Sequence, residues 1–567
     1  MPIALGLDVG TSSSKVVALD LATGQILAEV SKSYAMSTPQ AGWAEQDPGL
    51  WVAAAEEILT RIAAELGVRA ADVVALGLSG QMHSAVVLDE GLSVVRPALL
   101  WCDTRTAAEC RLIESVVGRE GLARSVGNAA LEGFTLPKLL WLRTHEPEAF
   151  ARIRHVVMPK DYVAWALTGA LGTEVSDASG TLAFSPRAGT RADELLAALG
   201  VDPSLFPAAL ESIAPRGLLL SAMAQKTGLP ASVVVACGAA DNAASAVGLG
   251  AIREGVGMVS LGTSGVVLLP TDSPRLDPTL RLHAFRSAVP GRSYVMGVML
   301  SAGLALRWFR DTLGAEEMAI ARARGVDPYV VIAEAATKSR PGAGGVVFLP
   351  YLMGERTPHA DAQARGAFVG MSALTTRGDL ARAVFEGIVF GIADLLACTS
   401  SVDHAVAVTS LRVTGGGARS PLFLELLADV LGVTIETTEN PEGGALGAAL
   451  LGAVAAGGYG SVDEAVAACV RVAARIEPNP ARRGAYDRSL AAYRALYPAC
   501  RDTMHALADI ALVRPRRVGS ERKRAAPTRP PHTPSEGLHR REERGPSITS
   551  RADRGADREG PCTRRRW

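Results

Sequence analysis

The sequence predicts an α/β protein built from two similar lobes, and two observations support this prediction. Apolar strand-like segments alternate with helical ones in the first eighty residues, as in folds where helices pack on a sheet. A Gly-Thr-Ser turn between apolar segments also occurs twice, in "DVGTSSSKVVAL" from Asp8 and in "SLGTSGVVLLP" from Ser260. The copies lie about half of the expected folded body apart, so we expect one copy in each lobe.

The individual elements follow from periodicity and turn residues. Residues 3–30 predict a β-hairpin or meander, residues 48–66 a helix, and residues 73–80 a further strand. A later strand enters Gly415-Gly416-Gly417, and a helix capped by Ser420, with Pro421 in its first turn, follows. The segment "EGGALGAALLGAVAAGG" predicts a helix of small residues that packs tightly against its neighbours.

Composition limits the class of protein. The 567 residues are 48% hydrophobic with zero formal net charge, which predicts about two to four domains and argues against electrostatic binding of nucleic acid by the whole chain. The start has no basic segment typical of a signal peptide, and we find no apolar run of about 18 or more residues. The seven cysteines lack a C-x-x-C pair. We therefore expect a cytoplasmic protein with reduced thiols, with no membrane partner.

The C-terminal segment differs from the rest in charge. Residues 514–567 contain 16 Lys and Arg against 7 Asp and Glu, whereas residues 1–513 contain 42 and 51. This basic segment has almost no aliphatic residues, which predicts a disordered tail over residues 513–567. It is either an arm that binds a partner or nucleic acid, or a dispensable extension; the lack of interleaved aromatic residues favours the extension.

The stretch "GAADNAASAVGLG" places one carboxylate, Asp241, among small residues directly after a short apolar strand. An aspartate here could cap the following helix. It could also serve as a general base, because small neighbours leave it unpaired and let a substrate approach closely. The residue types alone do not choose between these two roles.

The repeated turns suit a phosphate ligand. Thr11 and Ser12 in the first copy, and Thr263 and Ser264 in the second, offer hydroxyl and backbone N–H donors without a repelling charge. An ordinary hairpin is the alternative for either copy alone. Neither turn matches a Walker A or a G-x-G-x-x-G motif, so a P-loop and a Rossmann site are not predicted.

An ordered set of motifs adds a family resemblance over residues 3–510. They include "GLDVGTSSSK", "GLSGQMHSAVVLD", "LLWCDTR", "GAADNAASAVGLG", "FLPYLMGERTPH" and "GGGARS". In this order they resemble the FGGY family of carbohydrate kinases, of the actin-like ATPase superfamily. "QMHSA" and "GERTPH" favour the members that phosphorylate D-xylulose. Cys102 stands where the family pattern has Asn, and Ala239-Ala240 where Gly is common.

The resemblance implies two actin-like (ribonuclease H-like) lobes with a cleft between them: a sugar-binding lobe over residues 1–246 and a nucleotide-binding lobe over 247–512. It implies Asp241 as the catalytic base and Asp8 as the ligand of a magnesium–phosphate site. Sugar contacts are expected from Met82, His83, Asp103, Arg105, Asn242 and Trp43. Asp103 and Arg105 could instead form an ion pair lining the pocket, and Trp43 could be a loop anchor. ATP contacts are expected from Thr11, Ser12, Lys15, Thr263, Ser264, Gly303, Gly415, Gly416 and Gly417, although Lys15 could equally be a solvated hairpin lysine.

The function implied by this resemblance is the ATP- and Mg²⁺-dependent phosphorylation of D-xylulose to D-xylulose 5-phosphate. One alternative is a kinase of the same family acting on another ketose or polyol. Another is a non-catalytic regulator that binds sugar or ATP, although such a protein would need no base. A homodimer is expected only by analogy with the family.

Overall fold

The computed structural model describes residues 1–404, 406–441 and 443–512. Residues 1–512 form one compact unit. The predicted basic tail, residues 513–567, lies outside the described residues. Within them, no helix has both the length and the apolar character needed to cross a membrane.

A seven-stranded mixed sheet, the first sheet, organises the N-terminal half. Its path is β13-β14-β5-β1-β2-β3, and β15 also pairs with β5. The strands are β1 (Ile3–Val9), β2 (Ser13–Asp20), β3 (Ile26–Ser33), β5 (Val73–Gly80), β13 (Pro215–Leu218), β14 (Val234–Ala236) and β15 (Ala239–Ala240). The predicted meander over residues 3–30 and the strand at 73–80 are thus confirmed.

A second seven-stranded sheet repeats this plan in the C-terminal half. Its order is β18-β19-β17-β16-β22-β23-β24. The strands are β16 (Gly255–Leu261), β17 (Gly265–Thr271), β18 (His283–Arg286), β19 (Ser293–Met299), β22 (Val408–Thr414), β23 (Thr434–Thr438) and β24 (Val472–Ile476). In both sheets an antiparallel hairpin lies beside two parallel strands and a final antiparallel strand. The predicted two-lobed α/β architecture is confirmed.

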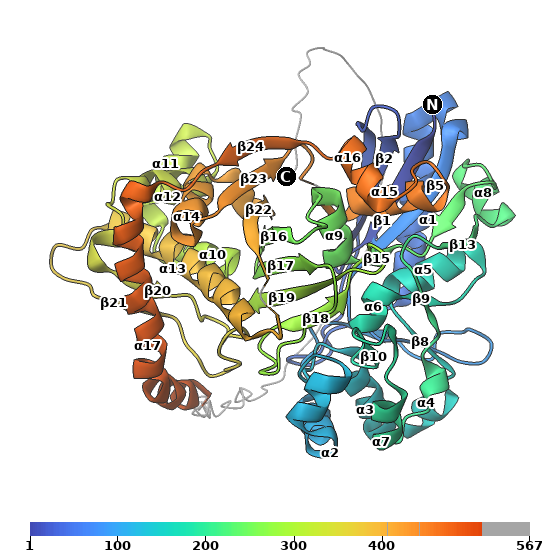
Figure 1. The fold of residues 1–567 in the computed structure, drawn as a ribbon, viewed down its shortest axis with the longest axis horizontal. Helices are drawn as coiled ribbons and strands as arrows, with labels where there is room; N and C mark the ends of the chain where they lie inside the picture. The colour runs from blue at the N-terminus through green and yellow to red at the C-terminus, as the bar shows by residue number, and fades with distance from the viewer. Residues whose placement is uncertain (405, 442, 513–567) are drawn as a thin grey trace, which may run out of the picture. The chain divides into compact units, whose positions relative to one another are not determined.

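Two helices of small residues connect the sheets. α9 (Asp241–Leu249) follows β15, and α15 (Gly443–Ala455) packs on β1, on β5 and on α9 (Figure 1). A Cβ atom built on Gly447 would overlap the carbonyl of Ala244, and one on Gly248 the carbonyl of Gly443. The predicted tight packing of α15 is confirmed. Because α15 lies on the first sheet, the packing crosses the predicted boundary at residues 246–247, and that boundary stays a prediction.

Local sequence signals set the helix ends. α1 (Pro48–Leu66) begins after Asp47, whose carboxylate accepts the Gly49 N–H, and it matches the predicted helix 48–66. Ser420 caps α14 (Pro421–Leu431) by accepting the Phe423 N–H, as predicted. The remaining α-helices are α2 (Ala107–Ser125), α3 (Thr135–His145), α4 (Pro147–Arg152), α5 (Pro159–Thr168), α6 (Val175–Ser179), α7 (Asp193–Ala198), α8 (Ser221–Thr227), α10 (Gly303–Thr312), α11 (Ala315–Arg324), α12 (Pro328–Thr337), α13 (Arg377–Ala397), α16 (Val462–Cys469) and α17 (Pro480–Leu512).

Short strands form small two-stranded sheets on the loops: β4 (Glu45–Gln46) with β7 (Ala98–Leu99), β6 (Val86–Leu88) with β8 (His155–Val157), β9 (Thr173–Glu174) with β12 (Ala209–Leu210), β10 (Phe184–Ser185) with β11 (Thr190–Arg191), and β20 (Val347–Leu349) with β21 (Ala367–Val369).

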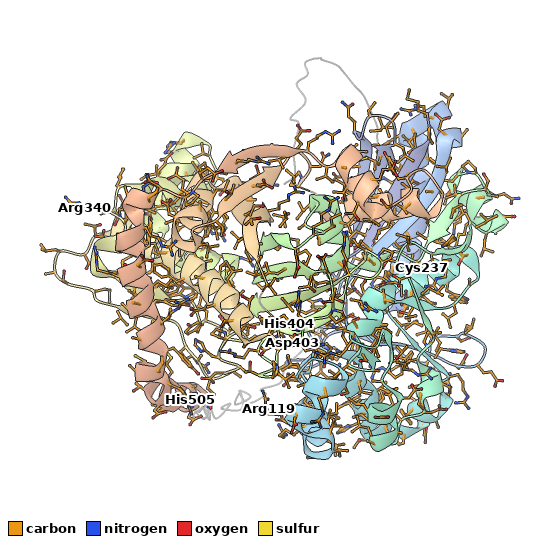
Figure 2. All side chains as sticks on the ribbon, viewed as in Figure 1. Arg119, Cys237, Arg340, Asp403, His404 and His505 are labelled. Atoms are coloured by element: carbon orange, nitrogen blue, oxygen red, sulfur yellow. The ribbon has the colours of Figure 1, made fainter. Side chains whose placement is uncertain are left out.

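Side chains pack densely between the sheets and their helices. Figure 2 shows Cys237 among core side chains and Arg340 on the outside. The six cysteines of the described residues are all free, and four of them are buried. This agrees with the prediction of reduced core thiols.

Candidate active site

The carboxyl ends of three parallel strands place Asp8 and Asp241 at the same edge of the first sheet. Asp8 and Val9 on β1 are opposite Ser79 and Gly80 on β5, and these are opposite Ala239 and Ala240 on β15. Asp241 follows β15 directly as the first residue of α9. β1 and β15 lie on either side of β5, and the two carboxylates are near enough for the charge of Asp8 to act on Asp241.

The Asp241 carboxylate is hydrogen-bonded on one side. Its Oδ1 accepts the Asn242 backbone N–H at 2.6 Å and the Asn242 Nδ2–H at 2.9 Å. None of the described residues forms a hydrogen bond with Oδ2. Burial, followed by the charge of Asp8, raises the pKa of Asp241 to about 7, although the Asn242 hydrogen bonds oppose this shift. A half-buried carboxylate with this pKa is poised to accept a proton near neutral pH.

Asp241 does not have the predicted helix-capping position. Ala240 is the N-cap residue of α9, and Asp241 is the first residue inside the helix. The Ala240 N–H donates to Ser176 Oγ at 3.0 Å, and Ser176 Oγ donates to Glu174 at 2.8 Å. The backbone just before Asp241 is therefore fixed by a buried polar network.

Lys160 places one positive charge in that network. Its ammonium lies 2.7 Å from Asp161, 3.1 Å from Asp177 and 3.4 Å from Glu174, and all four side chains are fully buried. Burial raises the pKa of Asp177, and the neighbouring Asp161 and Glu174 raise it further against the effect of Lys160. The segment "MPKDYV" carries this lysine, but a lone Lys-Asp pair in the sequence gives no sign that it lies beneath Ala240.

Met82 and His83 lie in the turn after β5, next to the Asp241–Asn242 pair. Asn242 Nδ2 lies 3.7 Å from the sulfur of the buried Met82. His83 Nδ1 lies 2.6 Å from the Gly180 carbonyl, which can only accept, so Nδ1 carries the proton. Burial lowers the pKa of His83 to about 3, and the neutral ring therefore presents Nε2 as a hydrogen-bond acceptor.

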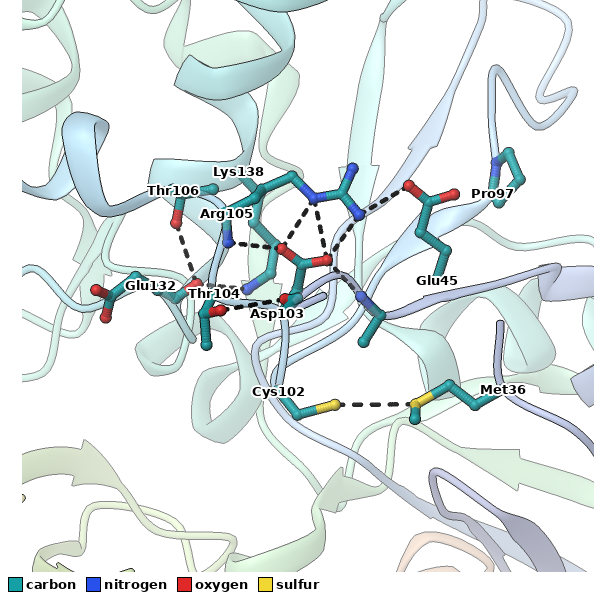
Figure 3. Close-up of polar contacts among 12 residues, drawn as sticks. Met36, Glu45, Pro97, Cys102, Asp103, Thr104, Arg105, Thr106, Glu132 and Lys138 are labelled. Atoms are coloured by element: carbon teal, nitrogen blue, oxygen red, sulfur yellow. Dashed lines mark hydrogen bonds and ion pairs between the residues drawn. The ribbon is translucent and has the colours of Figure 1, made fainter. Parts of the chain in front are cut away.

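Asp103 and Arg105 form the ion pair that was one of their two predicted roles. Arg105 binds the Asp103 carboxylate at 2.7 Å and Glu45 at 2.8 Å, and both residues of the pair are buried (Figure 3). The guanidinium also lies 3.6 Å from the ring centroid of Trp43, whose ring packs edge-on against Trp141. These contacts are those of a loop anchor. Direct contact of Trp43, Asp103 or Arg105 with a sugar stays a prediction, and burial of the ion pair disfavours it.

The first Gly-Thr-Ser turn is held by side chains from several loops. Thr11 Oγ1 donates to Gln81 at 3.1 Å and accepts the Trp101 indole N–H at 2.9 Å. Ser12 is exposed in the same turn. Lys15, on β2, forms an ion pair with Glu29 at 2.9 Å. This contact places Lys15 within the hairpin, and a role at a phosphate stays a prediction.

Trp101 is a residue of this region that sequence reasoning did not select. Its side chain is 43% exposed although it is large and apolar, and its backbone N–H donates to Ser84 Oγ at 3.1 Å. It therefore lies between the first turn and the turn that carries Met82 and His83. The motif "LLWCDTR" contains it, but the charged residues of that motif drew the prediction instead.

The second Gly-Thr-Ser turn assembles with two glycine elements. The Gly303 N–H, at the start of α10, donates to the Gly262 carbonyl at 2.9 Å, and any Cβ at Gly303 would overlap that carbonyl. Gly415 has a φ of 81°, and a Cβ there would lie 2.7 Å from the Leu261 carbonyl. Nothing lies within 4 Å of a Cβ at Gly416.

The structure therefore brings the predicted ATP residues of the second sheet to one edge. Those residues are Thr263, Ser264, Gly303, Gly415, Gly416 and Gly417. Thr263 accepts a hydrogen bond from Arg307 at 3.2 Å. This edge offers hydroxyl groups and backbone N–H groups, and its glycines let a ligand approach the backbone closely, which suits a nucleotide.

Residues 3–248 match the N-terminal domain, and residues 257–456 the C-terminal domain, of the FGGY family of carbohydrate kinases. The chain belongs to this family. Its membership implies use of ATP. The N-terminal match contains the whole first sheet, and the C-terminal match contains most of the second, whose last strand β24 lies beyond residue 456.

Several FGGY relatives carry the same name. The chain is 36% identical over 511 residues to the xylulose kinase of Lactococcus lactis subsp. lactis (strain IL1403), covering 90% of this chain and 99% of the relative. It is 37% identical over 496 residues to the xylulose kinase of Escherichia coli (strain K12), covering 87% and 98%. A solved xyloylose kinase from Brucella ovis has a TM-score of 0.80 at 37% identity, covering 89% of this chain and all of that one.

Proposed function

We propose that this FGGY kinase transfers the γ-phosphoryl group of ATP to the primary hydroxyl of D-xylulose, forming D-xylulose 5-phosphate and ADP. One observation carries the chemistry: Asp241 offers an oxygen without a hydrogen-bond partner among the described residues and has a pKa raised to about 7. The substrate comes from the names of the similar proteins in Lactococcus lactis and Escherichia coli.

In the proposed step, Asp241 Oδ2 accepts the hydroxyl proton while the sugar oxygen forms a bond to the γ-phosphorus. The bond from that phosphorus to the β,γ-bridging oxygen breaks, and ADP leaves. Asn242 holds Oδ1 by two hydrogen bonds and leaves Oδ2 available. Because a carboxylate with a pKa near 7 is a stronger base than one near 4, its burial favours proton acceptance.

The sugar would lie between Asn242, Met82 and His83. The His83 Nε2 acceptor suits a sugar hydroxyl, and the Met82 side chain offers an apolar contact. Asp103, Arg105 and Trp43 would support this pocket from behind through their ion pair and stacking. Trp101, exposed beside Thr11, would form the wall nearest to the first turn.

The phosphates would bind the hydroxyl and backbone N–H groups of Thr11, Ser12, Thr263 and Ser264, and the adenosine would lie against Gly303 and Gly415–Gly417. Asp8 would hold a Mg²⁺ together with the phosphates and water, because a hard carboxylate oxygen is a ligand that this ion prefers. The bound ion would neutralise phosphate charge.

A sugar panel tests the proposal. ADP release is measured with D-xylulose, D-ribulose, gluconate, xylitol and glycerol at equal concentrations. We expect kcat/KM for D-xylulose to exceed that for each other compound by at least about tenfold, a ratio that a few positioned hydrogen bonds supply. Preferential turnover of another polyol would overturn the substrate, and no turnover of any would overturn the kinase proposal.

A further inference from the structure

Lys138 is a buried lysine that no predicted role includes. It lies on α3, and its side chain has no solvent exposure. Its ammonium has three N–H donors and lies within hydrogen-bond distance of four backbone carbonyls, so at least one N–H is shared; they are those of Phe134 at 2.9 Å, Glu132 at 3.1 Å, His83 at 3.4 Å, and Gly133. Figure 3 shows the ammonium beside the Asp103–Arg105 ion pair.

This ammonium is held by carbonyl dipoles and not by a contacting carboxylate. Asp103 is the charge that stabilises the ammonium most, but its two oxygens are engaged by Arg105 and by the Ala44 N–H. Burial lowers the pKa of Lys138 to about 7, and the charge of Asp103 opposes this effect. Burying a cation in this way costs free energy, which the hydrogen bonds to one loop and one turn offset.

His83 needs such support because its backbone is strained. Its φ is 67°, in the left-handed region that non-glycine residues rarely adopt. Its carbonyl accepts hydrogen bonds from Thr135 Oγ1 at 3.0 Å and from Lys138. Its ring packs at 4.6 Å on Phe134, whose carbonyl also binds Lys138. The ammonium therefore holds the backbone of His83 and the backbone of Phe134, the residue whose ring packs against the imidazole.

We propose that Lys138 is a positioning residue for sugar binding: it fixes His83 in the left-handed conformation that aims Nε2 at the substrate. This inference rests on the proposed function, in which His83 contacts the sugar. Lys138 itself does not touch the substrate in this proposal. Its loss should therefore weaken sugar binding without affecting ATP binding or the base.

The test is Lys138→Met, which keeps the length of the side chain but removes the donors. We expect the KM for D-xylulose to rise about tenfold, as for the loss of one well-placed hydrogen bond, while kcat and the KM for ATP stay within about twofold. Lys226→Met is the matched control, since Lys226 is exposed and paired with Glu56 on the surface. It should leave all three constants unchanged.

A double-mutant cycle with His83→Ala separates positioning from general destabilisation. If Lys138 acts through His83, Lys138→Met adds no further rise in sugar KM to the His83→Ala enzyme. Additive effects, or a rise with Lys138→Met but none with His83→Ala, would overturn the proposal. An unchanged sugar KM in a folded Lys138→Met enzyme would overturn it as well.

A second variant and a second substrate cover two results that would otherwise leave the test undecided. If Lys138→Met does not fold, Thr135→Val tests the second donor to the same His83 carbonyl, and an unchanged sugar KM there would contradict the proposal. If the unmodified enzyme prefers another polyol, the substrate assignment fails by itself, and the same cycle is run with that polyol.

Discussion

The β1–β2 hairpin and the β16–β17 hairpin occupy equivalent places in the two sheets, but their turns differ in length and the strands before them differ in charge. The first leaves four residues, Gly10 to Ser13, between its last paired residues, and the second leaves three, Gly262 to Ser264. Asp8 on β1 is opposite Ser79, while Ser260 on β16 is opposite Thr414. The shared turn thus suits a shared ligand, phosphate, and the acid is confined to one sheet.

The helices that follow β15 and β23, which are α9 and α15, repeat this asymmetry. α9 begins with Asp241, whereas α15 begins with Gly443. The two helices nevertheless cross through matching small residues, Ala244 and Gly248 against Gly443 and Gly447. The two halves therefore share one frame, and they differ at the single positions, Asp8 and Asp241, to which we assign the proposed chemistry. Carboxylates in both halves would repel the phosphates that the turns are suited to bind.

The largest expected effect comes from removing the carboxylate of Asp241, which begins α9 and has no counterpart at the start of α15. Asp241→Asn should lower kcat by about 10³-fold, because general base catalysis contributes about 10²–10⁴-fold. The same variant should have a higher Tm than the original protein at pH 8. The raised pKa means that the ionised carboxylate costs stability, and this cost grows as the pH rises from about 4 to 7. At pH 4 the gain should disappear.

These two readouts give the prediction its control. Thermal unfolding at both pH values shows that the variant is folded, and ADP release gives kcat. A kcat within tenfold of the original would show that the difference between α9 and α15 is not catalytic. A Tm gain that persists at pH 4 would contradict the raised pKa.

The next effect tests the part that the two halves share, the helix crossing. Gly447→Ala should destabilise the fold by about 1–3 kcal/mol, because the new methyl group would overlap the Ala244 carbonyl. Gly484→Ala, in an exposed position of α17, is the matched control and should stabilise by up to about 1 kcal/mol. Urea unfolding midpoints measure both. Equal effects of the two substitutions would show that the crossing tolerates larger residues.

The smallest effect concerns the charge of Asp8. In the original enzyme, kcat/KM for the sugar should fall about tenfold per pH unit below 7, as Asp241 becomes protonated. Asp8→Asn should move the midpoint of this acidic limb of the pH profile to lower pH by less than about one unit. The reason is that burial, and not the charge of Asp8, is the larger cause of the raised Asp241 pKa. Ser260→Ala, the equivalent position of the second sheet, should leave the limb in place.

The pH profiles are measured with saturating ATP, and the midpoint of the limb is compared rather than the rate. Removal of Asp8 should also lower the rate through the proposed magnesium site. A limb that does not move in Asp8→Asn, or that moves equally in Ser260→Ala, would contradict the electrostatic coupling of Asp8 to Asp241.

The sequence alone determined the local elements and the duplication. Periodicity and turn residues predict the meander and the helix over residues 48–66, and Ser420 with Pro421 predicts the start of α14. The two Gly-Thr-Ser turns predict the repeat. These signals are local, since each depends on a few neighbouring residues and on backbone preferences that hold in many proteins.

Only the tertiary structure decided which distant residues act together. Pairing of β1, β5 and β15 sets Asp8 and Asp241 at one edge, and their mutual charge and burial give Asp241 its pKa near 7. No pattern in the sequence indicates three other features: the carbonyls around the Lys138 ammonium, the buried network of Lys160, and the buried Asp103–Arg105 ion pair. Their interactions join segments far apart in the chain, and burial, which sets their strength, exists only in the folded protein.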